Sequence, residues 1–303
     1  MHRRLKLENR STWLAASGAV LLWSTVATAF KIALRHSSPF ELLFLSSAFS
    51  AVALVGICAL GSRIREIVPR TASVWLRTLA LALLNPFLYY AVLFTAYDRL
   101  PAQVAQPLNY TWAFVLAFLA VPMLGKQLRK VDIVGAVIAY GGVWVICLGA
   151  SDLTPGGLSG LGVGLALGST IIWAMYWILL SSDSRPISVA LAAAFVVSVP
   201  LTAALAFASG MSFPTLPALA STAYVGLFEM GITFVLWGYA VRSAVRVARV
   251  ASLIFLSPFL SLVFINFVLK EPVKLASVAG LGLIVAGLLV QRMKSKEPGK
   301  EAK

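Results

Sequence analysis

Gln106-Pro107-Leu108-Asn109-Tyr110-Thr111-Trp112 is the stretch that most constrains the fold and function of this chain. It lies inside the apolar run Ala102–Leu124, which is long enough to cross a bilayer. A helix in hydrocarbon must satisfy its polar groups with partners inside the protein. The presence of glutamine, asparagine, tyrosine and proline within seven positions therefore indicates a structural or functional role. Wound at 3.6 residues per turn, the run has one small, polar face, which carries Ala102, Gln106, Asn109, Ala113, Ala117 and Ala120. Such a face either packs closely against another helix or lines a cavity.

The composition is that of a polytopic membrane protein. Of 303 residues, 60% are hydrophobic and 12% are charged, and the mean hydropathy is +0.90. The two cysteines, Cys58 and Cys147, lie in apolar runs, and the two histidines, His2 and His36, are terminal or in a loop. This pattern predicts no disulfide framework, no metal site, no cofactor and no histidine-based catalysis.

Ten apolar segments of about 20 residues, the length of a spanning helix, follow one another along the chain. They predict an all-α integral membrane protein with spans at Trp13–Leu34, Phe40–Leu60, Ser73–Tyr97, Ala102–Leu124, Ile133–Leu148, Leu158–Leu180, Ser188–Ala208, Leu216–Val241, Val247–Leu269 and Leu275–Val290. The connectors hold prolines, glycines and serines, and none is long enough for a separate soluble domain.

Lysine and arginine orient the predicted bundle. With both termini in the cytoplasm, twenty of these residues fall on the cytoplasmic side and five on the other side: Lys31, Arg35, Arg99, Lys270 and Lys274. The positive-inside rule therefore supports an even number of spans and two cytoplasmic termini. It also explains the net charge of +14 as membrane topology, so no nucleic-acid partner is expected.

The chain resembles itself at a spacing of about 145–150 residues. Leu21-Leu22-Trp23-Ser24 is echoed by Ile171-Ile172-Trp173-Ala174, and Val131-Asp132-Ile133-Val134-Gly135 by Ala276-Ser277-Val278-Ala279-Gly280. An odd number of spans per copy inverts the second copy, which places a substrate site between the copies near the midplane. The predicted organisation is a tail at 1–12, five-helix repeats at 13–149 and 158–290, and a basic tail at 291–303.

Polar and aromatic residues gather at mid-span in several segments. Tryptophan and tyrosine usually lie at the membrane interfaces, so deep ones call for another explanation. An aromatic cavity would offer stacking and indole or hydroxyl donors to a flat substrate ring, whereas the alternative for each ring is helix packing or lipid contact. The residues predicted to bind substrate are Trp23, Tyr90, Gln106, Asn109, Tyr110, Trp173, Tyr176 and Trp237, with Gln106 and Asn109 on its polar end; Trp112 and Trp177 are equally deep.

Glu229 is the acid that the predicted spans place near mid-membrane. It would carry a proton in an antiport cycle or bind a substrate ammonium, and the competing interpretation is a neutral acid hydrogen-bonded inside the bundle. Prolines within spans, including Pro86, Pro107 and Pro258, predict kinks that act either as hinges or as static bends.

Several motifs resemble a known family. Leu22-Trp23-Ser24 in the first segment, and Pro258 followed by Leu269-Lys270-Glu271 in the ninth, resemble the drug/metabolite transporter superfamily with EamA-type repeats. Leu108-Asn109-Tyr110-Thr111-Trp112, Ile172-Trp173-Ala174-Met175-Tyr176 and Trp237-Gly238 look like its YddG branch of aromatic amino-acid exporters. Two features depart from that pattern: the second segment lacks the arginine of many members, and Leu124-Gly125-Lys126 stands where many have Leu-Gly-Glu.

The resemblance implies a multi-pass exporter of aromatic amino acids and similar amphipathic metabolites in a bacterial inner membrane. The expected mechanism is facilitative alternating access, with proton-coupled export of other amino acids, metabolites or drugs through Glu229 as the alternative. No serine–histidine–aspartate set and no phosphate-binding loop is found in the sequence, so no enzymatic activity is expected. Expected partners are the small-molecule substrate and the lipid bilayer; the sequence does not fix the oligomeric state, and a monomer would suffice.

Overall fold

The computed structural model describes residues 9–125, 127–150, 157–244, 250 and 252–292, and every regular element in these residues is helical. Within these described residues, eight helices are long and apolar enough to cross a membrane: Arg10–Leu34, Pro39–Leu60, Ala72–Arg99, Ala102–Leu124, Lys130–Gly149, Gly160–Ser181, Ile187–Ala208 and Leu216–Ser243. Two shorter apolar helices follow, Leu253–Leu269 and Leu275–Gln291. These agree with the predicted segments to within a few residues, except that Val247, the predicted start of the ninth, lies outside the described residues.

Several spans are built from shorter pieces. In the first half of the chain the elements are α1 (Arg10–Ser24), α2 (Val26–Leu34), α3 (Pro39–Leu60), η1 (Ile64–Glu66), α4 (Ala72–Ala82), η2 (Leu83–Leu88), α5 (Tyr89–Arg99), α6 (Ala102–Asn109), α7 (Trp112–Leu124) and α8 (Lys130–Gly149). In the second half they are α9 (Gly160–Ser181), α10 (Ile187–Ala208), α11 (Leu216–Tyr224), η3 (Val225–Ile232), α12 (Thr233–Ser243), η4 (Ser252–Leu256), α14 (Ser257–Phe264), η5 (Ile265–Leu269) and α15 (Leu275–Gln291).

Interruptions inside spans lie where the sequence weakens the helix. Pro86 lies in η2, a π-helical turn, and Asn85 beside it leaves helical geometry with φ −147° and ψ 121°. Pro107 lies near the end of α6, and the span breaks shortly after it, at Tyr110 and Thr111, between α6 and α7. Thr25 separates α1 from α2. These breaks set the directions of the side chains around them, because each one resets the helical phase.

Hydrogen-bonded caps fix where some helices start. Ser38 and Glu41 form a capping box at the start of α3, and Pro39 occupies its first turn. The fifth predicted span begins earlier than its apolar run, at Lys130 and not at Ile133, because the Asp132 carboxylate accepts a 2.8 Å bond from the Arg129 backbone N–H.

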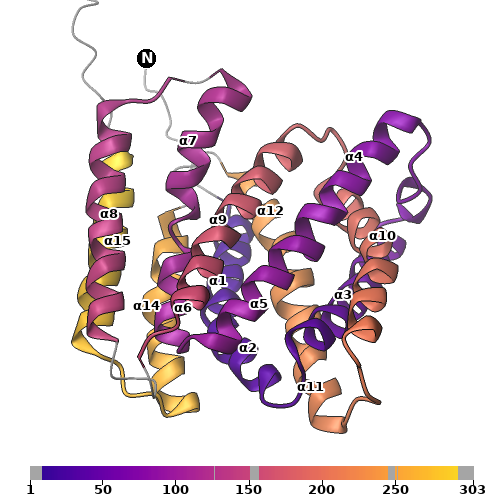
Figure 1. Ribbon diagram of the computed structural model, residues 1–303. Coiled ribbons are helices and arrows are strands. Elements are labelled where there is room, and N and C mark those ends of the chain that lie inside the picture. Colours follow the sequence, from indigo (N-terminus) through magenta and orange to yellow (C-terminus); the bar gives the residue numbers. More distant parts are fainter. Residues whose placement is uncertain (1–8, 126, 151–156, 245–249, 251, 293–303) are drawn as a thin grey trace, which may run out of the picture.

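The last helices of the two predicted repeats pack directly on each other. Figure 1 shows α8 and α15 side by side at one edge of the bundle. Their contact is antiparallel and made by glycines, since a Cβ on Gly135 would come 2.6 Å from the Gly287 carbonyl oxygen and one on Gly280 would come 2.5 Å from the Gly142 carbonyl oxygen. Only residues without a side chain allow two helix backbones to approach this closely.

Contacts between distant parts of the chain define the two ends of the bundle. One end carries most of the described lysines and arginines and is called the positive end. There, the Thr12 hydroxyl is hydrogen-bonded to the Ser243 hydroxyl, and the guanidinium groups of Arg77 and Arg129 donate to the carbonyls of Ser182 and Gln291. At the far end, the Ser212 backbone N–H donates to Glu41. Further bonds at the far end join Lys31, Gln103 and Glu271 to neighbouring helices. The positive end carries most of the described lysines and arginines, as the orientation argument requires.

Candidate functional site

A cavity of about 670 Å³ opens at the positive end and runs into the middle of the bundle. Its mouth is formed by the last turns of four helices, with Leu124, Ser181, Val241 and Gln291 among the residues there. Its deepest residues include Phe30 and Tyr97, both buried. The volume lies within the range of about 300–1,000 Å³ that is typical of small-molecule sites.

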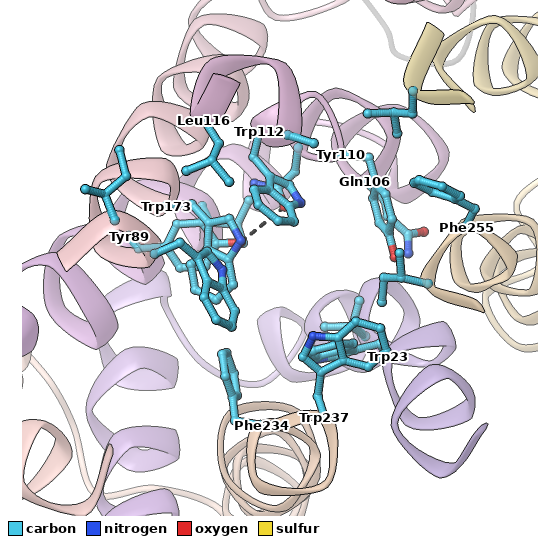
Figure 2. A pocket seen from close by; sticks show the side chains of 18 of the residues that line it. Trp23, Tyr89, Gln106, Tyr110, Trp112, Leu116, Trp173, Phe234, Trp237 and Phe255 are labelled. Carbon is cyan, nitrogen blue, oxygen red and sulfur yellow. Dashed lines mark hydrogen bonds between the residues drawn. The ribbon is translucent and has the colours of Figure 1, made fainter. Parts of the chain in front are cut away.

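Aromatic rings make up much of the wall, and Trp173 is their centre. The Trp173 ring stacks on Tyr89, with centroids 4.3 Å apart and planes inclined by 24°. It also meets Trp112 at 6.4 Å and Phe234 at 5.6 Å, both edge-on. Figure 2 shows these rings around the open cavity, with Trp23 and Trp237 on another side of it.

The second aromatic group belongs to α1 and α12. Trp23 lies 5.5 Å from Trp237 and 5.7 Å from Phe234, measured between ring centroids. Because Phe234 also contacts Trp173, the rings of five helices form one connected surface. A surface of this kind favours a flat ligand, through area buried and through edge-to-face contacts.

Two side-chain amides in the cavity wall differ in whether their hydrogen-bonding groups already have protein partners. The Asn109 side chain is already used: it accepts a 3.1 Å bond from the Tyr89 hydroxyl and donates a 2.9 Å bond to Ser169 Oγ. Gln106, one turn away, is 2% exposed, and neither its Nε2 nor its Oε1 has a protein partner. Figure 2 shows the Gln106 side chain at the cavity wall, between Tyr110 and Phe255. A buried amide without partners costs free energy until a ligand or water supplies them.

The structure separates the predicted site residues into two groups. Seven of them line the cavity: Trp23, Tyr90, Gln106, Asn109, Tyr110, Trp173 and Trp237. Tyr176 and Glu229 do not. Tyr176 is buried behind Trp173, with ring centroids 5.5 Å apart, so it supports that ring from outside the cavity. Glu229 is 1% exposed and lies 2.9 Å from the hydroxyl of Thr25.

The cavity also contains residues outside the set predicted from the sequence. Trp177 follows Trp173 by one turn of α9, and this spacing is the sequence signal that assigns it to the cavity. Trp112 also lines the cavity, but the break between α6 and α7 separates it from Asn109, so helical spacing does not assign it. Phe30, Tyr89, Phe234 and Phe255 also line the cavity. An isolated phenylalanine in an apolar span gives no sequence signal, because lipid contact and core packing explain it equally well.

The interior of the cavity is almost free of charge. Among the lining residues in the described part of the chain, Arg292 alone carries an ionised side chain, and it lies at the mouth over the Phe255 ring, 4.6 Å from its centroid. Within the described residues, no cluster of three histidine, cysteine or acidic side chains is arranged to hold a metal ion. The interior therefore offers stacking and neutral hydrogen bonds to a ligand.

Comparison with known families accounts for the architecture. The model of the EamA-like transporter family matches the chain twice, over residues 10–148 and 160–292. The chain belongs to this family. It is thus a multi-pass membrane transporter of the drug/metabolite transporter superfamily.

Relatives of this EamA-like transporter occur in bacteria and archaea. The "Uncharacterized transporter YvbV" of Bacillus subtilis (strain 168) is 27% identical, over 96% of this chain and 94% of its own. An "Uncharacterized transporter" of Archaeoglobus fulgidus is 25% identical, over 92% and 97%. A crystal structure with 23% identity superposes with a TM-score of 0.68, over 93% of this chain and 96% of the other, and it supports the fold alone.

Proposed function

We propose that this chain exports aromatic amino acids and similar small amphipathic metabolites by alternating access. The observation that carries the proposal is the cavity itself: connected aromatic rings surround an interior without ionised side chains, and the Gln106 amide in its wall lacks a partner. A substrate ring would stack against Trp173 and Trp23, while its polar end would bond to Gln106.

The orientation is compatible with the proposed direction of transport. If the positive end faces the cytoplasm, the cavity is open to the cytoplasm and closed at the far end, as expected of an exporter ready to load. The same reasoning favours ten spans and two cytoplasmic termini, and the resemblance to aromatic amino-acid exporters implies a bacterial inner membrane. The antiparallel glycine contact of α8 with α15 supports two inverted five-helix repeats, at 13–149 and 158–290.

Purified protein in liposomes loaded with labelled phenylalanine tests the proposal. We expect efflux that unlabelled tryptophan inhibits and that threonine and choline do not. Trp173→Ala and Tyr110→Ala should each lower phenylalanine efflux, and Trp173→Phe should restore part of it by keeping a ring. The matched control is Trp144→Ala, because Trp144 lies on α8, outside the cavity, and is 69% exposed.

The outcomes separate the substrate classes. Absence of aromatic efflux, with transport of threonine or choline instead, would overturn the aromatic assignment and leave the fold and family intact. Equal loss in the Trp144 and Trp173 variants would remove the cavity from the mechanism. Each variant is first checked for a monodisperse elution profile, so that loss of folding is not read as loss of transport.

A further inference from the structure

Glu229 occupies a separate polar site behind the cavity wall. It lies in η3, the π-helical segment between α11 and α12, and it is 1% exposed. Its Oε2 has no hydrogen-bond partner in the protein. Among the described residues, no lysine, arginine or histidine forms an ion pair with it. The cavity does not include Glu229, so this acid is not placed to touch a substrate.

The hydroxyl of Thr25 has more oxygen neighbours than one hydrogen can serve. Its Oγ1 lies 2.7 Å from the Leu22 carbonyl oxygen, 2.8 Å from the Tyr224 hydroxyl and 2.9 Å from Glu229 Oε1. A threonine hydroxyl donates once and accepts twice, and a carbonyl only accepts. If Thr25 donates to Leu22, it must accept from both Tyr224 and Glu229, and Glu229 can donate only when it carries a proton.

Loss of that proton would force a different pattern. An ionised Glu229 accepts only, so the Thr25 hydrogen would turn to it and away from Leu22. The Leu22 carbonyl would still accept the 2.9 Å bond from the Thr25 backbone N–H, so this second pattern is also permitted. The site can therefore hold Glu229 with or without a proton, and the two states differ in the bonds made at Thr25.

Thr25 connects this difference to the cavity. It is the residue at which α1 ends and α2 begins, and its neighbours Trp23 and Val26 both line the cavity. Hydrogen bonds of the Thr25 side chain therefore connect the break in the first span to η3 in the eighth span. A change in these bonds acts on the helix break that lies two residues after Trp23.

Among the described residues, the titratable groups that interact with Glu229 are tyrosines. Tyr224 reaches it through Thr25, and Tyr90, Tyr97 and Tyr110 lie close enough to interact with it electrostatically. The α3 residues that pack against η3 include Ser46 and Phe49, and the one charged residue of α3, Glu41, lies in its first turn and bonds Ser212 at the far end. Lys31, on α2, donates to the Tyr97 and Leu100 carbonyls.

We infer that Glu229 and Thr25 form a proton-binding site, distinct from the substrate cavity, through which the transporter exchanges a proton for its substrate. The Glu229 carboxylate takes up one proton to become a carboxylic acid and later releases it, with no change in electron count. The inference rests on the proposed transport function and favours its coupled form over the facilitative one. The substrate and the proton would use different residues, and Thr25 would be the positioning residue between them.

Infrared spectroscopy tests proton binding without any transport assay. In the wild-type protein in lipid, we expect a carbonyl stretch of a protonated carboxylic acid that shifts in heavy water and disappears on alkaline titration. Glu229→Gln should lack this band. The control Asp98→Asn should keep it, because the Asp98 side chain is 46% exposed. A spectrum without a Glu229-dependent band at any pH would overturn the inference.

Transport under an imposed pH gradient tests the coupling. With one-for-one exchange, a gradient of one pH unit should sustain about a tenfold phenylalanine ratio across the membrane. Glu229→Gln and Thr25→Val should abolish this concentrative transport and leave downhill exchange that no longer depends on pH, whereas Thr25→Ser should keep the coupling. Equal accumulation by Glu229→Gln and the wild type would overturn the inference. If phenylalanine does not move at all, the substrate assignment fails, and the infrared result still decides the proton site.

Discussion

The side-chain oxygen of Gln103 on α6 accepts a 2.8 Å hydrogen bond from the hydroxyl of Ser277 on α15. The same oxygen accepts a 3.0 Å bond from the Lys274 backbone N–H, and Gln103 Nε2 donates a 3.0 Å bond to the Pro272 carbonyl. Gln103 is fully buried, so a single amide joins the two halves of the chain at the end where the cavity is closed. At the same end, Lys31 donates bonds of 2.9 and 3.2 Å to the carbonyls of Tyr97 and Leu100, within the first half of the chain.

Gln103→Leu should open the far end more often. Loss of two or three net bonds costs about 2 kcal/mol, which corresponds to roughly a 30-fold shift in the balance between closed and open states. The measurement is labelling of an engineered Leu93→Cys in the cavity by a membrane-impermeant maleimide added from the far side, with Cys58 and Cys147 replaced by alanine. Gln291→Leu, the same change at the opposite end, is the control and should not increase labelling. Unchanged labelling of the Gln103 variant would show that other contacts hold this end closed.

Gln106→Leu should weaken the binding of substrates with polar groups selectively. Losing the amide that bonds the polar end costs about 1–2 kcal/mol, so KM for phenylalanine should rise about tenfold. Inhibition by an aromatic compound without polar substituents should not weaken, because the rings are intact. Competition curves with the two inhibitor types measure the difference. Equal loss of affinity for both would mean that the substitution disturbs the cavity as a whole.

The glycine contact between α8 and α15 predicts opposite effects at adjacent positions. A Cβ on Gly142 would overlap the Gly280 backbone, whereas one on Gly141 would meet nothing within 4 Å. Gly142→Ala should therefore lower the free energy of unfolding by about 1–3 kcal/mol. Gly141→Ala should be neutral or stabilising by up to about 1 kcal/mol, because alanine favours a helix. Thermal unfolding in the same detergent compares the pair, and equal melting temperatures would refute the close approach.

Asp183, in the connector between α9 and α10, predicts a pH dependence of stability. Burial opposes ionisation of this carboxyl, but hydrogen bonds from the side chain and backbone of Arg185 outweigh it and hold the pKa of Asp183 below its usual value. A lowered folded-state pKa gives stability that is present above the unfolded value of about 3.9 and is lost as the pH falls through the folded value.

Asp183→Asn should therefore destabilise the protein at pH 7, and the difference from the wild type should shrink as the pH is lowered below about 4. Melting temperatures across a pH series measure this convergence. Asp98→Asn is the exposed control, since its partner Arg99 is 3.8 Å away and the Arg99 and Asp98 side chains are 38% and 46% exposed. A wild-type advantage that is constant from pH 7 to pH 3 would exclude ionisation of Asp183 as its source.

The local chemistry of the sequence determined a large part of this protein. The lengths of the apolar runs predict helices that cross a membrane. A helix forms all the hydrogen bonds of its backbone N–H and C=O groups within one segment, which hydrocarbon requires. Asn109, Tyr110 and Trp173 could be assigned to a cavity because polar and aromatic groups are costly or unusual at mid-span. Short sequence motifs also showed the family resemblance, and the family model confirms it at the level of EamA-like transporters.

Only the tertiary structure decided how the helices face one another. A span that is apolar all round has no face that periodicity can assign, so the sequence could not show that Tyr176 stands behind Trp173 or that Gln103 reaches Ser277. The sequence placed Glu229 near mid-membrane, but it could not show the contact with Thr25, which lies 204 residues away in the chain. Such pairings depend on helix rotation, on breaks that reset the helical phase, and on glycines that set interhelical distance. These are properties of the packed bundle, because no single segment contains both partners.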